Sequence, residues 1–165
     1  SVCVSWAVCC QRLGASVEPL QETNALLGEL LSQTSRHVDI ASPQLEPALL
    51  DSDAVGRALA QLARRGRHTR IRILLRDFRP EQFAGHRLLA VAGRLTTAVT
   101  VRALEAHPEW ADETWVICDG LDGLLLKTAA RSARRFYGRP EAKRLTTVFE
   151  RLWLASEPIP ELCRF

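Results

Sequence analysis

The chain has 165 residues, of which 47% are hydrophobic and 25% charged, and its formal net charge is +3. This composition is typical of a globular protein, and the length is enough for one domain to bury a sizeable core. The only apolar run near the N-terminus, residues 2–10, is too short to span a bilayer and lacks the basic flank of a secretory signal. We therefore expect one cytoplasmic domain with no membrane segment.

The five cysteines include no Cys-x-x-Cys pair, and no histidine follows them at zinc-finger spacing. Cys118 lies inside an apolar run and is most simply a small core residue. The sequence also contains neither a Gly-x-Gly-x-x-Gly pattern nor a Walker phosphate-binding loop. We expect no disulfide framework, no metal centre and no cofactor.

Charged residues are distributed unevenly along the chain. Residues 57–72 contain six arginines and no acid, and residues 131–144 contain six basic residues against the single acid Glu141. Between them, residues 105–122 carry six carboxylates and no lysine or arginine. Most of these charges fit an ordinary solvated surface, although successive segments alternate in sign.

The first half of the chain predicts two helices and two strands. Leucines at one-turn spacing predict an amphipathic helix over residues 22–34, and residues 37–42 follow as a short strand. After two prolines, Asp51 or Ser52 can cap a second helix. Alternating apolar residues then predict a strand over residues 70–75. Strand, helix and strand in this order indicate a right-handed crossover between parallel strands.

The second half predicts two further helices and three strands. Apolar residues share one helical face over residues 86–95, and valines mark a strand over residues 99–101. Two apolar strands, residues 115–118 and 124–126, flank Asp-Gly pairs that favour a hairpin turn. A last helix is expected over residues 141–155. The fold class is therefore α/β, with a mixed β-sheet flanked by helices.

Several segments, in their order and spacing, resemble one half of a phospholipase D-like enzyme. The opening segments are Ile40-Ala41-Ser42, Ala58-Leu59 through Arg65-Gly66, and Arg72-Ile73-Leu74-Leu75-Arg76-Asp77. The later segments are Val116-Ile117-Cys118-Asp119-Gly120 and Phe149-Glu150-Arg151-Leu152-Trp153-Leu154-Ala155-Ser156, the second of which resembles the closing helix of that fold. The resemblance implies a phospholipase D-like domain over residues 22–165, preceded by an N-terminal extension over residues 1–21.

Two more segments resemble an uncharacterised bacterial family of such domains. These segments are Gly85-His86-Arg87-Leu88-Leu89 and the C-terminal Pro160-Glu161-Leu162-Cys163-Arg164-Phe165. The resemblance implies a bacterial, single-half member of the phospholipase D-like superfamily.

The catalytic motif of the resembled enzymes is His-x-Lys-x-x-x-x-Asp, and here Asp112 and Thr114 replace the His and the Lys while Asp119 is kept. By resemblance, the reaction needs a histidine nucleophile, a second histidine as general acid, and lysines that neutralise the phosphate. The Gly-Ser-x-Asn that normally follows the motif is absent, and nearby carboxylates would repel a phosphodiester. We therefore interpret the chain as a catalytically degenerate, non-catalytic binding or regulatory module.

An alternative hypothesis is a phosphate-ester enzyme with a relocated site around His86. This residue begins a predicted helix whose backbone N–H groups, together with Arg87, could hold an anion. Ordinary structural roles stay open, since His86 could be a capping or packing residue and Asp77 a hydrogen-bond partner in a loop. The candidate ligand-binding residues are Ser42, Gln44, Arg76, Asp77, His86 and Arg87.

The acidic hairpin region offers a further alternative, a site for a hard cation such as Mg²⁺ or Ca²⁺. Its carboxylates are Asp112, Glu113, Asp119 and Asp122. An Asp-Gly-x-Asp-Gly hairpin is more simply a turn, and we assign it no metal.

The arginine-rich runs suggest a nucleic-acid-binding protein, because arginine binds phosphate through a bidentate fork. The candidate contacts are Arg64, Arg65 and Arg67. Opposite charges along the chain also suit self-association or docking to a protein partner. Single-motif members of the resembled superfamily form dimers, so we expect a homodimer, with the strand region around Trp110 and Trp115 as its interface.

Overall fold

The computed structural model describes residues 16–76, 78–79, 81, 85–127 and 132–159. The resemblance noted for residues 160–165 therefore lies outside the described residues. Within the described ranges, no helix is long and apolar enough to cross a bilayer.

The described residues form one mixed sheet of eight strands. In spatial order these are β1 (Ser16–Pro19), β7 (Ser132–Tyr137), β6 (Asp122–Lys127), β5 (Glu113–Cys118), β2 (His37–Ala41), β3 (Arg70–Leu75), β4 (Val99–Ala103) and β8 (Glu157–Pro158). β3 pairs in parallel with both β2 and β4, and the remaining neighbours are antiparallel. The parallel pairing predicted for β2 and β3 is thus confirmed.

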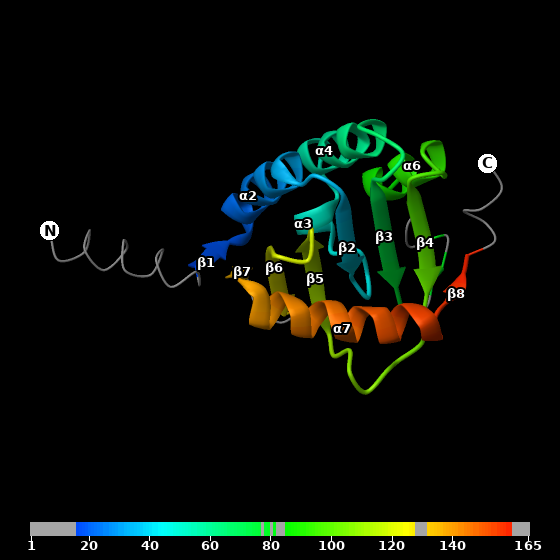
Figure 1. Ribbon diagram of the computed structural model, residues 1–165. Helices are drawn as coiled ribbons and strands as arrows, with labels where there is room; N and C mark the ends of the chain where they lie inside the picture. The colour runs from blue at the N-terminus through cyan, green and yellow to red at the C-terminus, as the bar shows by residue number, and fades with distance from the viewer. Residues whose placement is uncertain (1–15, 77, 80, 82–84, 128–131, 160–165) are drawn as a thin grey trace, which may run out of the picture.

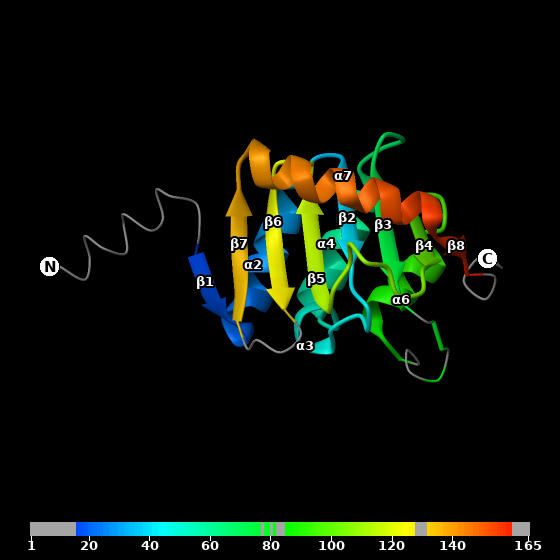
Figure 2. The ribbon, with the colours of Figure 1, turned by 90° about the horizontal axis from the view of Figure 1, so that it is seen from below.

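Helices cover both faces of the sheet, so the molecule has three layers (Figure 1). On one face lie α2 (Leu20–Gln33), α3 (Pro47–Leu50), α4 (Asp53–Arg64) and α6 (Arg87–Arg94). The long helix α7 (Arg139–Ala155) crosses the strands on the opposite face, as the view from below shows (Figure 2). The predicted α/β architecture, a mixed sheet flanked by helices, is confirmed.

Local signals account for the helix and strand positions that were predicted. The hydroxyl of Ser52 accepts the amide of Val55 at 3.2 Å, so Ser52 rather than Asp51 caps α4. The structure adds β1, β7, β8 and α3, which the sequence pattern did not indicate. In β7, two arginines separate the buried Ala133 and Phe136, which hides the alternation of a strand. β1 and the start of α2 precede residue 22, and the boundary proposed there stays a prediction.

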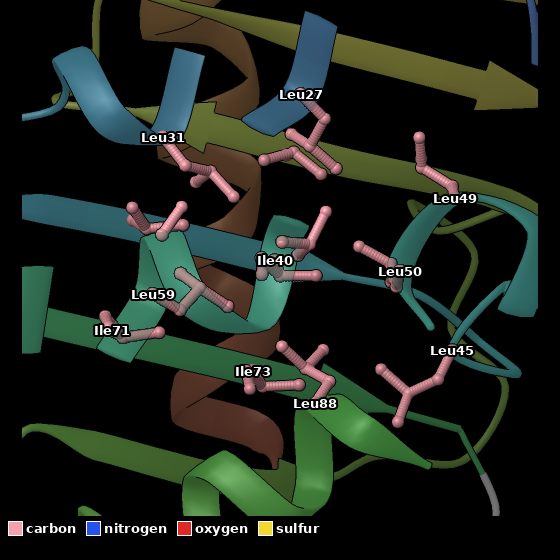
Figure 3. Packing of buried hydrophobic residues seen from close by; sticks show 14 of the residues in the cluster. Leu27, Leu31, Ile40, Leu45, Leu49, Leu50, Leu59, Ile71, Ile73 and Leu88 are labelled. Atoms are coloured by element: carbon pink, nitrogen blue, oxygen red, sulfur yellow. The ribbon is translucent and has the colours of Figure 1, made fainter. Parts of the chain in front are cut away.

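The larger core lies between the sheet and the face covered by α2, α4 and α6 (Figure 3). Ile40, Ile71 and Ile73 point from β2 and β3 into this layer, and Leu59 and Leu88 meet them from α4 and α6. All five side chains are buried. Because alternate strand residues point to opposite faces, the intervening positions of the same strands face α7.

The second core lies between the sheet and α7. Trp115 on β5 and Phe136 on β7 pack with Leu145, Phe149 and Leu152 of α7. Each of these side chains is at most 3% exposed, which fixes α7 across the antiparallel half of the sheet.

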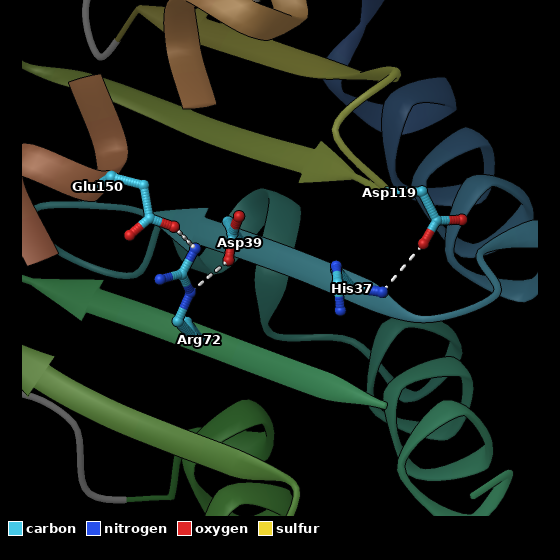
Figure 4. A network of polar contacts seen from close by, with 5 residues as sticks. All are labelled: His37, Asp39, Arg72, Asp119 and Glu150. Carbon is cyan, nitrogen blue, oxygen red and sulfur yellow. Dashed lines mark hydrogen bonds and ion pairs between the residues drawn. The ribbon is translucent and has the colours of Figure 1, made fainter. Parts of the chain in front are cut away.

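A buried arginine joins α7 to the parallel half (Figure 4). Nε of Arg72 donates to Asp39 at 2.8 Å, and Nη2 donates to Glu150 of α7 at 2.5 Å. The guanidinium also lies 5.0 Å from the ring centroid of Phe149 and 5.4 Å from that of Trp153. Burial opposes the charge on Arg72, but the hydrogen bonds that it donates to Glu150 and Asp39 outweigh burial and raise the pKa of the guanidinium.

Gly123 on β6 permits a close approach that no other residue allows. A β-carbon at this position would lie 1.8 Å from the carbonyl oxygen of Val116 and 2.8 Å from the ring of Phe136. We predict that Gly123→Ala lowers the free energy of unfolding by about 3 kcal/mol, because the backbone of β5 must move. Urea unfolding followed by circular dichroism measures the change.

The matched control is Gly93→Ala in α6, where an added β-carbon would meet no atom within 4 Å. This substitution should raise the free energy of unfolding by about 0.5–1 kcal/mol, since alanine favours a helix interior over glycine. Equal stabilities of the two variants would contradict the close packing of β6.

Candidate functional site

The first two motif positions lie at the start of β5, beside the loop that follows β2. Thr114 is buried, and its hydroxyl lies 2.9 Å from the hydroxyl of Ser42, which is fully buried. The Ser42 hydroxyl also accepts the amide of Glu46 at 3.1 Å. Where the resembled motif has a lysine, this chain therefore has Thr114, whose uncharged hydrogen bond with Ser42 anchors the loop to β5.

The other replaced position, Asp112, forms an ion pair with Arg76 at 2.7 Å. Nη2 of Arg76 donates to the carbonyls of Trp110 at 2.7 Å and Ala111 at 3.3 Å. The guanidinium lies 4.7 Å from the ring centroid of Trp110. Arg76 is thus paired with a carboxylate and held by the segment before β5.

Asp119, the one residue of the motif pattern that this chain keeps, has a structural role. Its carboxylate accepts the amides of Ser35, Arg36 and His37, each at 2.9 Å, at the entry to β2. Figure 4 shows the contact with His37. Its backbone is left-handed, with φ of 54°, a conformation that Asp tolerates better than most residues. Burial opposes the charge, but the amides of His37, Ser35 and Arg36 outweigh it and lower the pKa of Asp119.

His86 caps α6 through its side chain. Nδ1 accepts the amide of Leu88 at 3.2 Å, and Nε2 lies 3.0 Å from the carbonyl oxygen of Leu45. The capping bond assigns the proton to Nε2, which then donates to that carbonyl. Both ring nitrogens are therefore engaged within the chain, and the residue is buried, with 7% of its surface exposed.

The loop after β2 brings three of the candidate ligand-binding residues together. The amide of Ser42 donates to Leu74, and the amide of Arg76 donates to Pro43 at 3.3 Å. His86 reaches the same loop through Leu45. The polar atoms described above are occupied by neighbours within the chain.

Of the other candidate ligand-binding residues, Gln44 belongs to the same loop, Arg87 lies apart from it, and Asp77 is outside the described residues. Gln44 is exposed. Arg87 faces α4 instead, where its side chain pairs with Asp53 at 3.4 Å and its amide donates to Asp51. A ligand at these positions stays a prediction.

The four carboxylates of the acidic region do not converge. Asp112 pairs with Arg76 and Asp119 binds backbone amides, whereas Glu113 accepts the indole N–H of Trp115 at 2.9 Å. Asp122 lies 3.6 Å from Arg135, and burial raises its pKa despite that arginine. Among the described residues, no three metal-binding side chains gather in one place.

The candidate nucleic-acid contacts divide into two kinds. Arg65 donates to the carbonyls of Thr34 at 2.8 Å and Ser32 at 3.1 Å, so it satisfies the C-terminal end of α2. Arg64 and Arg67 are exposed and border open hollows.

One of these hollows is a groove of about 330 Å³ between α4 and α6. Besides Arg64, it is lined by Arg57, Arg87 and Arg94. Arg57 and Arg94 were not among the candidate contacts named from the sequence. The sequence pattern that could have identified them is a repeated seven-residue spacing, Arg57 to Arg64 and Arg87 to Arg94, which keeps each pair on one side of a helix.

Trp110 and Trp115 are 1% and 3% exposed and belong to the core against α7. The expectation that they form a surface for a second copy was therefore wrong. Their apolar character was read correctly, but this chain's own α7 covers them.

Comparison with known proteins assigns the chain to a family. The match to the family described as Domain of unknown function (DUF7931) covers residues 19–165. The chain belongs to this family. No curated protein matches its sequence.

Solved structures show the same fold at low sequence identity. NucT from Helicobacter pylori is similar with a TM-score of 0.64 and 12% identity, covering 88% of this chain and 98% of NucT. Nuc from Salmonella typhimurium, a phospholipase D family member, gives a TM-score of 0.63 and 12% identity, covering 88% of this chain and 97% of Nuc. The DUF7931 chain therefore has a phospholipase D-like α/β fold.

A third similar structure is TrmBL2, an archaeal chromatin protein with a novel mode of DNA binding. Its TM-score is 0.63 at 16% identity, and the match covers 88% of this chain and 54% of TrmBL2. The DUF7931 chain thus spans about half the length of that protein.

The role of Asp119 can be measured by substitution. We predict that Asp119→Ala lowers the free energy of unfolding by about 2–3 kcal/mol at pH 7, because three amides lose a charged acceptor and alanine resists the left-handed backbone. Asp119→Asn should cost only about 1 kcal/mol, since it keeps one acceptor and tolerates that backbone. Urea unfolding gives both values.

The stabilisation by Asp119 should also depend on pH. Its pKa is lowered in the folded state, so its contribution is complete above the unfolded pKa and is lost as pH falls through the folded value. The difference between wild type and Asp119→Asn should therefore shrink below about pH 4. A difference that grows on acidification would contradict this role.

Proposed function

We propose that this DUF7931 protein is a non-catalytic phospholipase D-like binding or regulatory module of the bacterial cytosol. The observation that carries the proposal is the state of the motif. Asp112 holds Arg76 in an ion pair, and Thr114 is hydrogen bonded to Ser42. Side chains that would attack or neutralise a phosphodiester are replaced there by groups that hold the fold together.

The geometry around His86 favours this proposal over a relocated phosphate-ester site. A general base needs a ring nitrogen within reach of its substrate. In His86, one nitrogen accepts the amide of Leu88 and the other contacts the carbonyl of Leu45, with the ring buried. These contacts support a capping role.

The purified protein should not hydrolyse bis(p-nitrophenyl) phosphate or a labelled oligonucleotide above the rate of a buffer blank. Absorbance of released nitrophenolate and gel analysis of the oligonucleotide measure this. Turnover that copurifies with the wild type and disappears in His86→Asn would contradict the proposal. Asparagine is the informative replacement because it still caps a helix, so the variant tests chemistry rather than folding.

A second candidate function is binding of nucleic acid. It is supported by the exposed Arg64 and Arg67, which make no ion pair among the described residues. One structurally similar protein, TrmBL2, binds DNA. Arg65 is a weaker candidate, because its guanidinium already caps α2. Binding through phosphates would weaken steeply with salt.

The proposed assembly is a homodimer, with docking to another protein as the alternative. Its support is the resemblance to single-motif phospholipase D-like proteins, which pair, and the alternation of acidic and basic segments. Light scattering at micromolar concentration should give about twice the 18.4 kDa chain mass.

Salt provides a control for the homodimer. If opposite charges hold the two copies, the measured mass should fall toward one chain as ionic strength rises. A mass of one chain at every accessible concentration, in low salt as well, would contradict the homodimer.

A further inference from the structure

The groove between α4 and α6 gathers four arginines, of which three form no ion pair among the described residues. Its lining includes Arg57 and Arg64 from α4 and Arg87 and Arg94 from α6, and all four side chains are exposed. Asp53, the only carboxylate among the described lining residues, pairs with Arg87 at 3.4 Å. In the part of the chain that the structure describes, the other three arginines form no ion pair or hydrogen bond through their side chains.

The sequence builds this groove from small residues flanked by arginines. Gly56 and Ala60 of α4 and Ala90 of α6 contribute to the lining, so few side-chain atoms fill the space between the helices. Gly56 lies close to Val91, where a β-carbon would come within 3.6 Å of the valine side chain. The two helices therefore pack closely at Gly56 and Val91, at the floor of the groove, while the long arginine side chains border its open side.

The spacing of the arginines suits an extended polyanion rather than a single phosphate. Arg57 and Arg64 are separated by two helical turns, about 10.5 Å along the axis, and so are Arg87 and Arg94. A nucleic-acid strand carries one phosphate per about 3.4 Å of helical rise, so about three phosphates span that length.

A second hollow continues the first at the C-terminal end of α4. Its volume is about 420 Å³, and it shares Arg64 with the groove. Its other lining residues include Arg67, Thr69 and Thr97, which supply one more cation and two hydroxyl groups. The two hollows together make a basic track that extends beyond the groove between α4 and α6.

We propose that this track binds the phosphate backbone of a nucleic acid without reading its sequence. The proposal rests on the nucleic-acid candidate above and assigns it a surface. Neither hollow has an aromatic residue among its described lining residues, so stacked bases are not expected to contribute. Arginine forks and hydroxyl groups instead match phosphate oxygens.

A membrane surface fits the track less well. Interfacial binding needs large apolar side chains beside the basic ones. Among the described residues, the exposed large hydrophobic residues are Leu121, Tyr137 and Leu154, and none of them lines either hollow. The observations therefore favour a nucleic acid over an anionic lipid bilayer.

The second arginine-rich run is a poorer candidate. Arg134 pairs with Glu141, and Arg135 lies 3.6 Å from Asp122. Part of the positive charge of this run is therefore already neutralised. Lys143 and Arg144 of α7 are exposed, but α7 lies on the opposite face of the sheet from α4 and α6 (Figure 1). These two residues provide a matched control for the groove.

The test measures fluorescence anisotropy of labelled oligonucleotides of about 20 nucleotides, single-stranded and duplex, in salt from about 50 to about 200 mM. Wild type should bind both, with a slope of log K against log salt of about −3 for four arginine contacts. Arg57→Gln with Arg94→Gln should weaken binding at least about tenfold and reduce the slope by about 1.5. Lys143→Gln with Arg144→Gln should change affinity less than about twofold.

Thermal unfolding of the groove variant should show a midpoint equal to or above that of wild type, because removing unpaired like charges relieves repulsion. A loss of binding in a folded variant then reports on the groove itself.

Three results would overturn the inference. No binding of either oligonucleotide at the lowest salt would remove the nucleic-acid function together with its site. Wild-type binding that both variants retain, or that both lose equally, would leave nucleic-acid binding standing but place it outside the groove. Binding to phosphatidylglycerol vesicles without binding to oligonucleotides would show that the track recognises a membrane surface.

Discussion

The buried guanidinium of Arg72 is the constraint on which the arrangement of layers depends. Its side chain is 6% exposed and that of Asp39 is 7% exposed, so neither charge could be left alone without a cost of about 3–5 kcal/mol. Glu150 is 45% exposed and contributes less, but it is the contact that belongs to α7. This one side chain therefore ties two parallel strands and the helix that crosses them, with Phe149 and Trp153 stacked against it.

Polar groups at the two ends of β5 also hold segments of the fold together. Asp119 secures the entry to β2, Thr114 secures the loop after it, and Asp112 holds Arg76. Each contact links segments that are distant in the sequence. Among the described residues, arginines without an ion-pair partner lie instead along α4 and α6, where Arg57 and Arg94 border open space. The fold thus separates arginines that stabilise it from arginines that are available to a ligand.

Much of the fold could be predicted because its signals are local. Apolar spacing located α2, α4 and α6 and the strands β2 to β6, and the Ser52 cap marked the start of α4. β7 was missed because Arg134 and Arg135 interrupt its apolar residues, and its strand character comes from pairing with β6 and β1. Edge strands as short as β8 depend on a neighbour for their conformation and leave little pattern of their own.

For the site, the sequence by itself determined that the motif residues are replaced and that basic residues cluster in two runs. It also suggested a capping role for His86 as one reading. Only the tertiary structure decided which arginines are engaged, because their partners are distant in sequence. Arg65 meets Thr34 and Arg76 meets Asp112, across 31 and 36 residues respectively. The residue type sets the charge of a side chain, whereas its availability to a ligand depends on which groups the fold places within about 3 Å of it.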